Sequence, residues 1–210
     1  MVKISKVYTR VGDQGSTHLG DGSAVDKSSV RVGAYGLVDE ANSMLGYVVA
    51  SMPESDQGKT KEIREALLSI QNDLFDVGAD LCVPIDPSEE PGARLRIQSR
   101  QSDRIEVMID QFNEPLAPLD SFVLPGGTPL AADLHIARTV VRRAERGVAA
   151  LLSADHEQTN QEALVYLNRL SDLLFVLSRV ANDNGAKDVL WKPGASLEDD
   201  GIQTNDETAS

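Results

Sequence analysis

The sequence is short of cysteine, aromatic residues and basic residues, and each shortage excludes a class of protein. Cys82 is the only cysteine among 210 residues, so no disulfide can form within the chain, and a reducing, cytoplasmic location is expected. Aromatic residues make up 4% of the chain, which fits packed aliphatic helices better than a β-sandwich. Lysine and arginine together number 20 against 33 acidic residues, and this balance argues against a nucleic-acid-binding protein.

Long apolar runs are also missing. No stretch approaches the roughly 20 apolar residues needed to span a bilayer, and the first residues lack the apolar run of a signal peptide. We therefore expect a soluble protein with no membrane partner. The segment 196–210 holds five acidic residues and no basic one, and its polar composition predicts a disordered acidic tail. The rest of the chain is still acidic, so a polyanion would need basic residues gathered in one place.

Apolar residues recur at helical spacing in several parts of the chain. The predicted helices cover residues 32–50, 61–78, 99–113, 128–152 and 160–181. Thr128 followed by Pro129 is a typical helix start, and Gly78 is a plausible stop. Short or moderate loops join these segments, which predicts an all-α fold, a five-helix bundle. Weaker strand signals lie at 122–124 and 189–191.

Three regions follow from this pattern. Residues 1–29 precede the first helix, 30–195 form the bundle, and 196–210 form the tail. Residues 8–29 are rich in Gly, Ser, Thr and Asp, and the composition fits an ordered loop and a mobile tail equally well. Glycines in this stretch free backbone amides to point together at an anion. It lacks the Gly-Lys-Ser/Thr ending of a P-loop, and the alternative is an ordinary loop.

The densest basic cluster lies in the fourth predicted helix. Arg138, Arg142 and Arg146 are spaced four apart and share a helical face with Glu145. Like charges at this spacing destabilise an isolated helix. Guanidinium groups bind phosphate oxygens in pairs of hydrogen bonds, so a row of them suits a triphosphate. The alternative is a solvated face on which Glu145 offsets its neighbours.

A mixed stripe follows on the last predicted helix. Asn168, Asp172, Phe175 and Arg179 recur at steps of four, three and four. The stripe is either a polar contact between packed helices or a second wall of the cleft that holds the arginine row. No set of metal ligands is assigned, because the Glu-x-x-His pairs of a di-iron bundle are absent.

Several blocks of sequence occur together in an order typical of one family. They are residues 8–15 (YTRVGDQG), 34–43 (AYGLVDEANS), 122–127 (FVLPGG), 142–146 (RRAER) and 168–175 (NRLSDLLF). In this combination the chain resembles the PduO-type ATP:cob(I)alamin adenosyltransferases from residue 7 to about residue 194. Val11 and Ala41 stand where the family often has Thr and Leu, and neither change removes a ligand.

The resemblance implies a homotrimer with active sites between adjacent subunits. The nucleotide-binding residues it implies are Thr9, Arg10, Val11, Gly12, Asp13, Gly15, Thr17, His18 and Lys27, together with Arg143, Glu145, Arg146 and Asn168. The catalytic residues it implies are Arg142, Arg138, Asp39 and Phe122. In this scheme the arginine row comes from the neighbouring subunit, Asp39 pairs with Arg138 across the interface, and Phe122 lines the corrinoid face.

The resemblance also implies the chemistry. An apolar wall displaces the lower axial ligand of cob(II)alamin, a separate reductase supplies an electron, and cob(I)alamin attacks the 5′-carbon of ATP. Arginines and Mg²⁺ stabilise the departing triphosphate, and a further enzyme that depends on adenosylcobalamin uses the product. Two alternatives remain at this point. One is a nucleotide-binding bundle without chemistry, and the other is a purely structural helical trimer.

Overall fold

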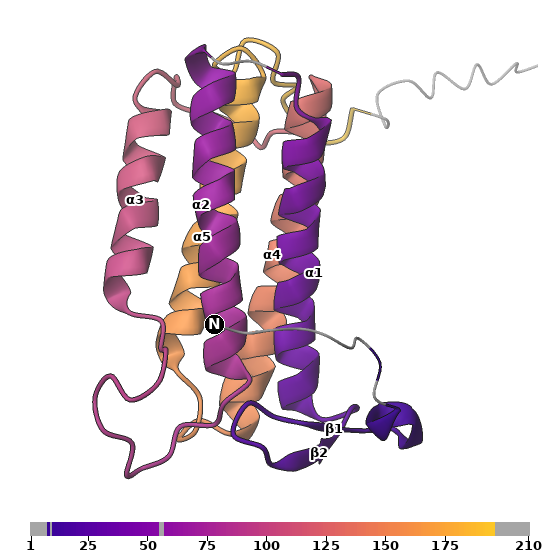
Figure 1. The fold of residues 1–210 in the computed structure, drawn as a ribbon. Coiled ribbons are helices and arrows are strands. Elements are labelled where there is room, and N and C mark those ends of the chain that lie inside the picture. Colours follow the sequence, from indigo (N-terminus) through magenta and orange to yellow (C-terminus); the bar gives the residue numbers. More distant parts are fainter. Residues whose placement is uncertain (1–7, 9, 55–56, 196–210) are drawn as a thin grey trace, which may run out of the picture.

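The computed structural model describes residues 8, 10–54 and 57–195. Its helices are α1 (Val30–Ser51), α2 (Gly58–Leu81), α3 (Ser99–Asn113), α4 (Pro129–Ala154) and α5 (Gln161–Ala181). They lie side by side as a bundle, with α3 on the outside (Figure 1). Helix α4 packs against both α5 and α1, while α2 packs against α1 and α3 against α5. The predicted all-α five-helix bundle is confirmed. Within the described residues, no helix combines the length and apolarity required to cross a membrane.

Local sequence signals explain most helix ends. The Thr128 hydroxyl accepts a hydrogen bond from the Ala131 amide at 3.2 Å, so it caps α4 as expected. Gly78, in contrast, does not end its helix, and α2 continues to Leu81. Val77 and Leu81 are 0% and 1% exposed, so core packing carries the helix past the glycine. The predicted stop at Gly78 is therefore wrong by three residues.

The core between the helices is mainly aliphatic. Leu45, Ile70, Leu134 and Leu170 are fully buried, each from a different helix. Tyr166 and Phe112 are aromatic members of the core, and the Tyr166 hydroxyl donates to an Asp73 carboxylate oxygen at 2.9 Å. Burial and the adjacent Asp73 carboxylate raise the pKa of Tyr166 well above its ordinary value, so the hydroxyl keeps its proton.

The segment before α1 is an ordered ribbon at one end of the bundle (Figure 1). A short 3₁₀ helix, η1 (Val11–Gln14), leads into strand β1 (Ser16–His18), which pairs antiparallel with β2 (Ala24–Asp26). The Gly20 amide donates to the Cys82 carbonyl at 2.9 Å, which ties the ribbon to the end of α2. Of the two interpretations of this segment, the ordered loop is the one that the structure shows.

A second small pairing lies at the opposite end of the bundle. Val123 and Leu190 form an isolated antiparallel bridge, where the sequence had weak strand signals. The bridge joins the loop before α4 to the chain after α5. It therefore fixes the place of Phe122, which comes directly before Val123.

Candidate active site

The glycine-rich segment folds so that Lys27 returns to η1. The Lys27 amide donates to the Gly15 carbonyl at 2.8 Å. A Cβ placed on Gly12 would lie 3.0 Å from the Lys27 Nζ, and Gly15 has a φ of +87°, which favours glycine. Gly12 thus leaves room for the lysine ammonium against this turn, and Gly15 suits its positive φ.

The same ribbon presents further donors to solvent. Arg10 is exposed and adopts left-handed backbone angles with φ 62°, and Asp13 and His18 are also exposed. Val11 is 60% exposed, and Thr17 is half-buried on β1. Thr9 lies outside the described residues. The predicted nucleotide-binding residues of this segment that can be placed thus lie on one small ribbon, with two cationic side chains and a hydroxyl.

The arginine row occupies one face of α4, and Glu145 on this face is hydrogen-bonded to α5. Arg142 and Arg146 are exposed. The Asn168 amide donates to a Glu145 carboxylate oxygen at 2.9 Å, and its own side-chain oxygen accepts from Arg169 at 2.8 Å. This pair of bonds holds Asn168 in a single orientation. The guanidinium groups of Arg142 and Arg146 stay exposed and open to a ligand.

The next two polar side chains along this face, buried His135 and half-buried Arg138, hold enclosed nitrogen atoms that have no partner. The Nε atom of Arg138 and both ring nitrogens of His135 are enclosed and make no hydrogen bond. Burial, and secondly the nearby Arg142 charge, lowers the pKa of Arg138. Burial, and secondly Arg138, lowers the pKa of His135, so its ring is uncharged at neutral pH. Orphaned buried nitrogens of this kind cost about 1–3 kcal/mol each, which indicates missing partners.

Aromatic side chains continue the face beyond His135. The His135 and Phe175 rings meet edge to face, with centroids 6.3 Å apart. Phe175 also lines a pocket of about 410 Å³ with Leu119, Asp120, Ser121 and Phe122. Phe122 is 77% exposed, so it is not an ordinary core residue.

The stripe on α5 makes the polar helix–helix contact that was one of its two interpretations, while its role as a wall of the arginine cleft stays a prediction. Asn168 makes a polar contact between helices, and Phe175 opens toward a pocket. Between them lies Asp172, whose pKa is raised by partial burial, against the effect of the neighbouring Arg169 and Arg142 charges. The face shared by α4 and α5 runs from arginines at one end to aromatic rings at the other. His135 and Arg142 are seven residues apart, or about 10 Å along the helix.

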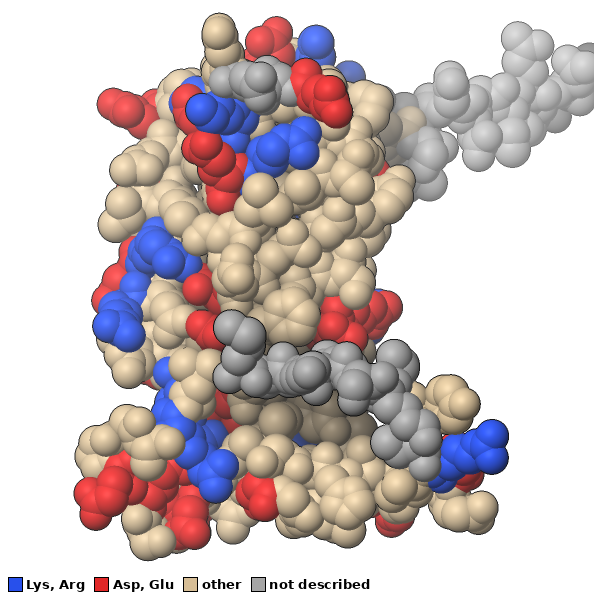
Figure 2. Space-filling view, in the orientation of Figure 1, with Lys and Arg blue, Asp and Glu red and all other residues tan. Residues whose placement is uncertain are grey.

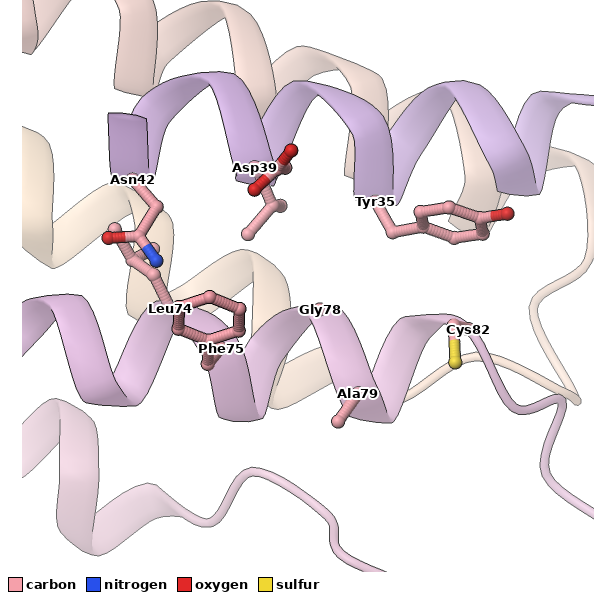
Figure 3. Close-up of a pocket in the computed structure, with 9 residues that line it drawn as sticks. Tyr35, Asp39, Asn42, Leu74, Phe75, Gly78, Ala79 and Cys82 are labelled. Atoms are coloured by element: carbon pink, nitrogen blue, oxygen red, sulfur yellow. The ribbon is translucent and has the colours of Figure 1, made fainter. Parts of the chain in front are cut away.

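Arg143 and Asp39 lie apart from this face. Arg143 forms an ion pair with Glu40 on α1. Asp39 lines a groove of about 360 Å³ between α1 and α2, with Tyr35, Phe75 and Cys82 nearby (Figure 3). Among the described residues, no hydrogen bond or ion pair joins Asp39 to Arg138. None joins the glycine ribbon to the arginine row either, so a single subunit presents these groups as separate surfaces.

His135 was not among the residues predicted for the site, and its place beside the arginine row was missed. Its position three residues before Arg138 on the same helical face was the available signal. Within the described part of the chain, no group of three or more His, Cys, Asp or Glu side chains could hold a metal ion.

Comparison with known proteins decides the family. The sequence profile of the cobalamin adenosyltransferase family matches residues 7–181. The chain belongs to this family. It is 50% identical over 196 residues to a corrinoid adenosyltransferase of Mycobacterium bovis, covering 92% of this chain and 96% of the relative. A corrinoid adenosyltransferase of Bacillus subtilis is 39% identical over 191 residues, covering 90% and 94%.

A solved structure supports the same assignment. It is a variant PduO-type ATP:corrinoid adenosyltransferase from Lactobacillus reuteri complexed with cobalamin and ATP. Its TM-score to this cobalamin adenosyltransferase family member is 0.80 at 36% identity, covering 89% of this chain and 99% of the other. The family predicted from the sequence blocks is confirmed.

Proposed function

We propose that this protein transfers the 5′-deoxyadenosyl group of ATP to cob(I)alamin, giving adenosylcobalamin and triphosphate. The α4–α5 face carries this proposal. Its arginine end, with Arg142 and Arg146, suits a triphosphate, and its aromatic end, with Phe122 and Phe175, suits the apolar face of a corrin ring. Both substrates would then meet on one surface, with the reacting carbon between them.

The reaction is a direct displacement. The Co(I) centre of the corrinoid donates an electron pair to the 5′-carbon of ATP, and a cobalt–carbon bond forms. The bond between that carbon and the α-phosphate oxygen breaks, its electron pair leaves with triphosphate, and the cobalt becomes formally Co(III). The protein positions the two substrates in line and stabilises the charge of the leaving group, so it needs no general acid or base.

The residues divide between these tasks. The segment 1–29 would wrap ATP through Arg10, the glycine turn and Lys27, and the bundle 30–195 would supply Arg142 and Arg146 to the phosphates. Mg²⁺ fits as a companion of ATP, because it is commonly held by substrate phosphates and only one or two carboxylates. Asp13 is an exposed carboxylate on the ribbon that could contribute one such ligand. Phe122 and Phe175 would exclude water from the cobalt face.

A homotrimer with shared sites completes this arrangement. Asp39 has no ion-pair partner among the described residues of its own subunit, and the Arg138 Nε is buried without one. The groove beside Asp39 is apolar, and Phe75 within it is 71% exposed. Few charged side chains lie on the central face over α1 and α2 (Figure 2). A second copy that lays its α4–α5 face here would pair Arg138 with Asp39, and three copies close a ring.

Two experiments test this function. The first incubates chemically reduced cobalamin with ATP and Mg²⁺ under anaerobic conditions and follows the absorbance change to adenosylcobalamin. The second mixes inactive Arg10→Ala and Arg142→Ala subunits. Sites built from two chains predict partial recovery of activity, because some interfaces regain both intact halves. Mixing Arg142→Ala with Arg146→Ala, two changes in the same half of the site, provides the matched control and should stay inactive.

The outcomes separate the two parts of the proposal. Absence of adenosylcobalamin in the first experiment would contradict the assigned reaction. Activity of the parent protein, but no recovery in verified mixed trimers of the two inactive variants, would contradict only the sharing of sites between subunits.

A further inference from the structure

Trp191 is the only tryptophan of the chain, and it lies beside Phe122. The two ring centroids are 6.1 Å apart with the planes tilted by 57°. Trp191 is 45% exposed and Phe122 is 77% exposed. Two large aromatic rings are therefore exposed side by side, one in the segment before α4 and one in the segment after α5.

The backbone fixes this pair of rings in register. The Trp191 amide donates to the Phe122 carbonyl at 2.7 Å, and the Leu124 amide donates to the Val189 carbonyl at 2.8 Å. The Ser121 hydroxyl donates to the Trp191 carbonyl at 2.7 Å. These bonds flank the Val123–Leu190 bridge, so Trp191 is part of a short antiparallel pairing.

A buried polar cluster holds the pairing against the bundle. The Asp188 carboxylate accepts from the Arg179 Nε and from the Asn182 amide, both at 2.9 Å. The side chains of Arg179 and Asp188 are only 8% and 3% exposed. Arg179 also donates to the Ala117 carbonyl at 3.0 Å, and the Asn182 amide donates to the Gly126 carbonyl at 3.2 Å. The cluster thus ties both sides of the Phe122 loop to the segment that leads to Trp191.

These hydrogen bonds hold the apolar rings of Phe122 and Trp191 exposed to solvent instead of letting them pack into the core. Isolated exposed apolar residues are ordinary, but two adjoining rings on a rigidly bonded support are typical of a ligand surface. Aromatic rings supply a large contact area with little loss of conformational entropy on binding. The ligand that fits is broad, flat and apolar on its faces, as a corrin is.

We infer that Trp191 is a second aromatic wall of the corrinoid site, beside Phe122. This inference rests on the proposed adenosyl transfer and extends it to a segment after α5. Trp191 contributes to corrinoid affinity and to the exclusion of water from the cobalt face, and it takes no part in ATP binding.

The test compares three variants of the full chain in the adenosylation assay. Trp191→Ala should raise the KM for cob(I)alamin by about fivefold to tenfold, equivalent to about 1–1.4 kcal/mol, as the loss of an aromatic contact requires. Its KM for ATP should stay within about twofold of the parent, as a change confined to the corrinoid side requires. Trp191→Phe should restore most of the corrinoid affinity. Leu190→Ala, on the opposite face of the pairing, is the matched control and should change neither constant.

A second measurement separates a ligand wall from a structural role. Bound cob(II)alamin should show less of the four-coordinate form with Trp191→Ala than with the parent protein. The double variant with Phe122→Ala should show a non-additive loss, because both rings would contact one ligand. If Trp191→Ala does not fold, Trp191→Leu, which keeps apolar bulk without the ring, takes its place.

Unchanged corrinoid affinity and an unchanged four-coordinate signal in a folded Trp191 variant would overturn the inference. Failure of the parent protein to make adenosylcobalamin would contradict the proposed function instead, so the two failures are distinguishable.

Discussion

Replacement of Phe122 by alanine separates a ligand wall from a packing residue, and the structure sets the expected magnitudes. Full burial of a phenylalanine side chain contributes about 1.5–3 kcal/mol. Phe122 is 77% exposed, so only a fraction of that stabilisation, about 0.5 kcal/mol, is available to lose. Its tilted contact with Trp191 adds about 0.5–1.5 kcal/mol. The unfolding free energy of Phe122→Ala should therefore fall by about 1–2 kcal/mol, against about 3–5 kcal/mol for a buried ring.

Activity should respond differently from stability. Without this wall, water and the lower axial base reach the cobalt more easily, and reduction to Co(I) becomes harder. Adenosylation that starts from cob(II)alamin with a reductase should collapse. Adenosylation that starts from chemically prepared cob(I)alamin should suffer less, and ATP binding should be retained.

The assay measures both reactions on one preparation, with urea unfolding and the spectrum of bound cob(II)alamin alongside. Val107→Ala is the matched control, because Val107 is an exposed apolar residue on α3 at 54% exposure. A folded Phe122→Ala protein that forms as much four-coordinate cobalt as the parent would refute the reasoning. A loss of about 3–5 kcal/mol in stability would likewise return Phe122 to a packing role.

Two other predictions concern the tail and a buried ring. Truncation after Ala195 should leave the rate of adenosylation unchanged, because residues 196–210 are polar and acidic without helical or strand periodicity; loss of activity in a folded truncation would contradict this. His135→Gln should reduce the loss of stability on acidification. Burial lowers the pKa of His135 below its ordinary 6.5, so as the pH falls below about 6.5 the unfolded chain binds a proton that the folded chain refuses. Urea unfolding of parent and variant at about pH 7 and about pH 5 measures the difference, and equal losses would exclude His135 as the source.

The helices could be predicted from the sequence because burial on one face leaves a period in the chain. Leu134, Ala137, Val141, Ala144 and Val148 recur at steps of three and four along α4, and all are buried. Thr128 and Pro129 mark the start of that helix. A capping hydroxyl and a proline at the first helical position act on the neighbouring backbone, so they can be recognised from the sequence alone. The family blocks then identified the bundle and its reaction.

Contacts between segments far apart in the sequence leave no periodic pattern, so they could not be predicted from it. The pairing of Arg143 with Glu40 depends on how α4 lies against α1, and spacing within α4 does not specify it. Gly78 behaves as a stop in isolation, yet packing on both sides continues α2 to Leu81. The buried cluster of Arg179, Asn182 and Asp188 joins residues that have no shared motif.

The unpaired nitrogens of Arg138 and His135 give a physical reason why the candidate site is incomplete in one subunit. A folded chain normally pairs its buried polar atoms, and these side chains instead lie one turn apart on a face that also carries exposed arginines. The carboxylate that would suit Arg138 best is Asp39, and within a subunit it lies on the groove between α1 and α2. Association of two subunits can bring the Arg138 guanidinium against the Asp39 carboxylate and, at the same time, bury the apolar groove between α1 and α2. Under the proposed function, the free energy withheld from the isolated fold would become available to the assembly, and the substrates would bind where two chains meet.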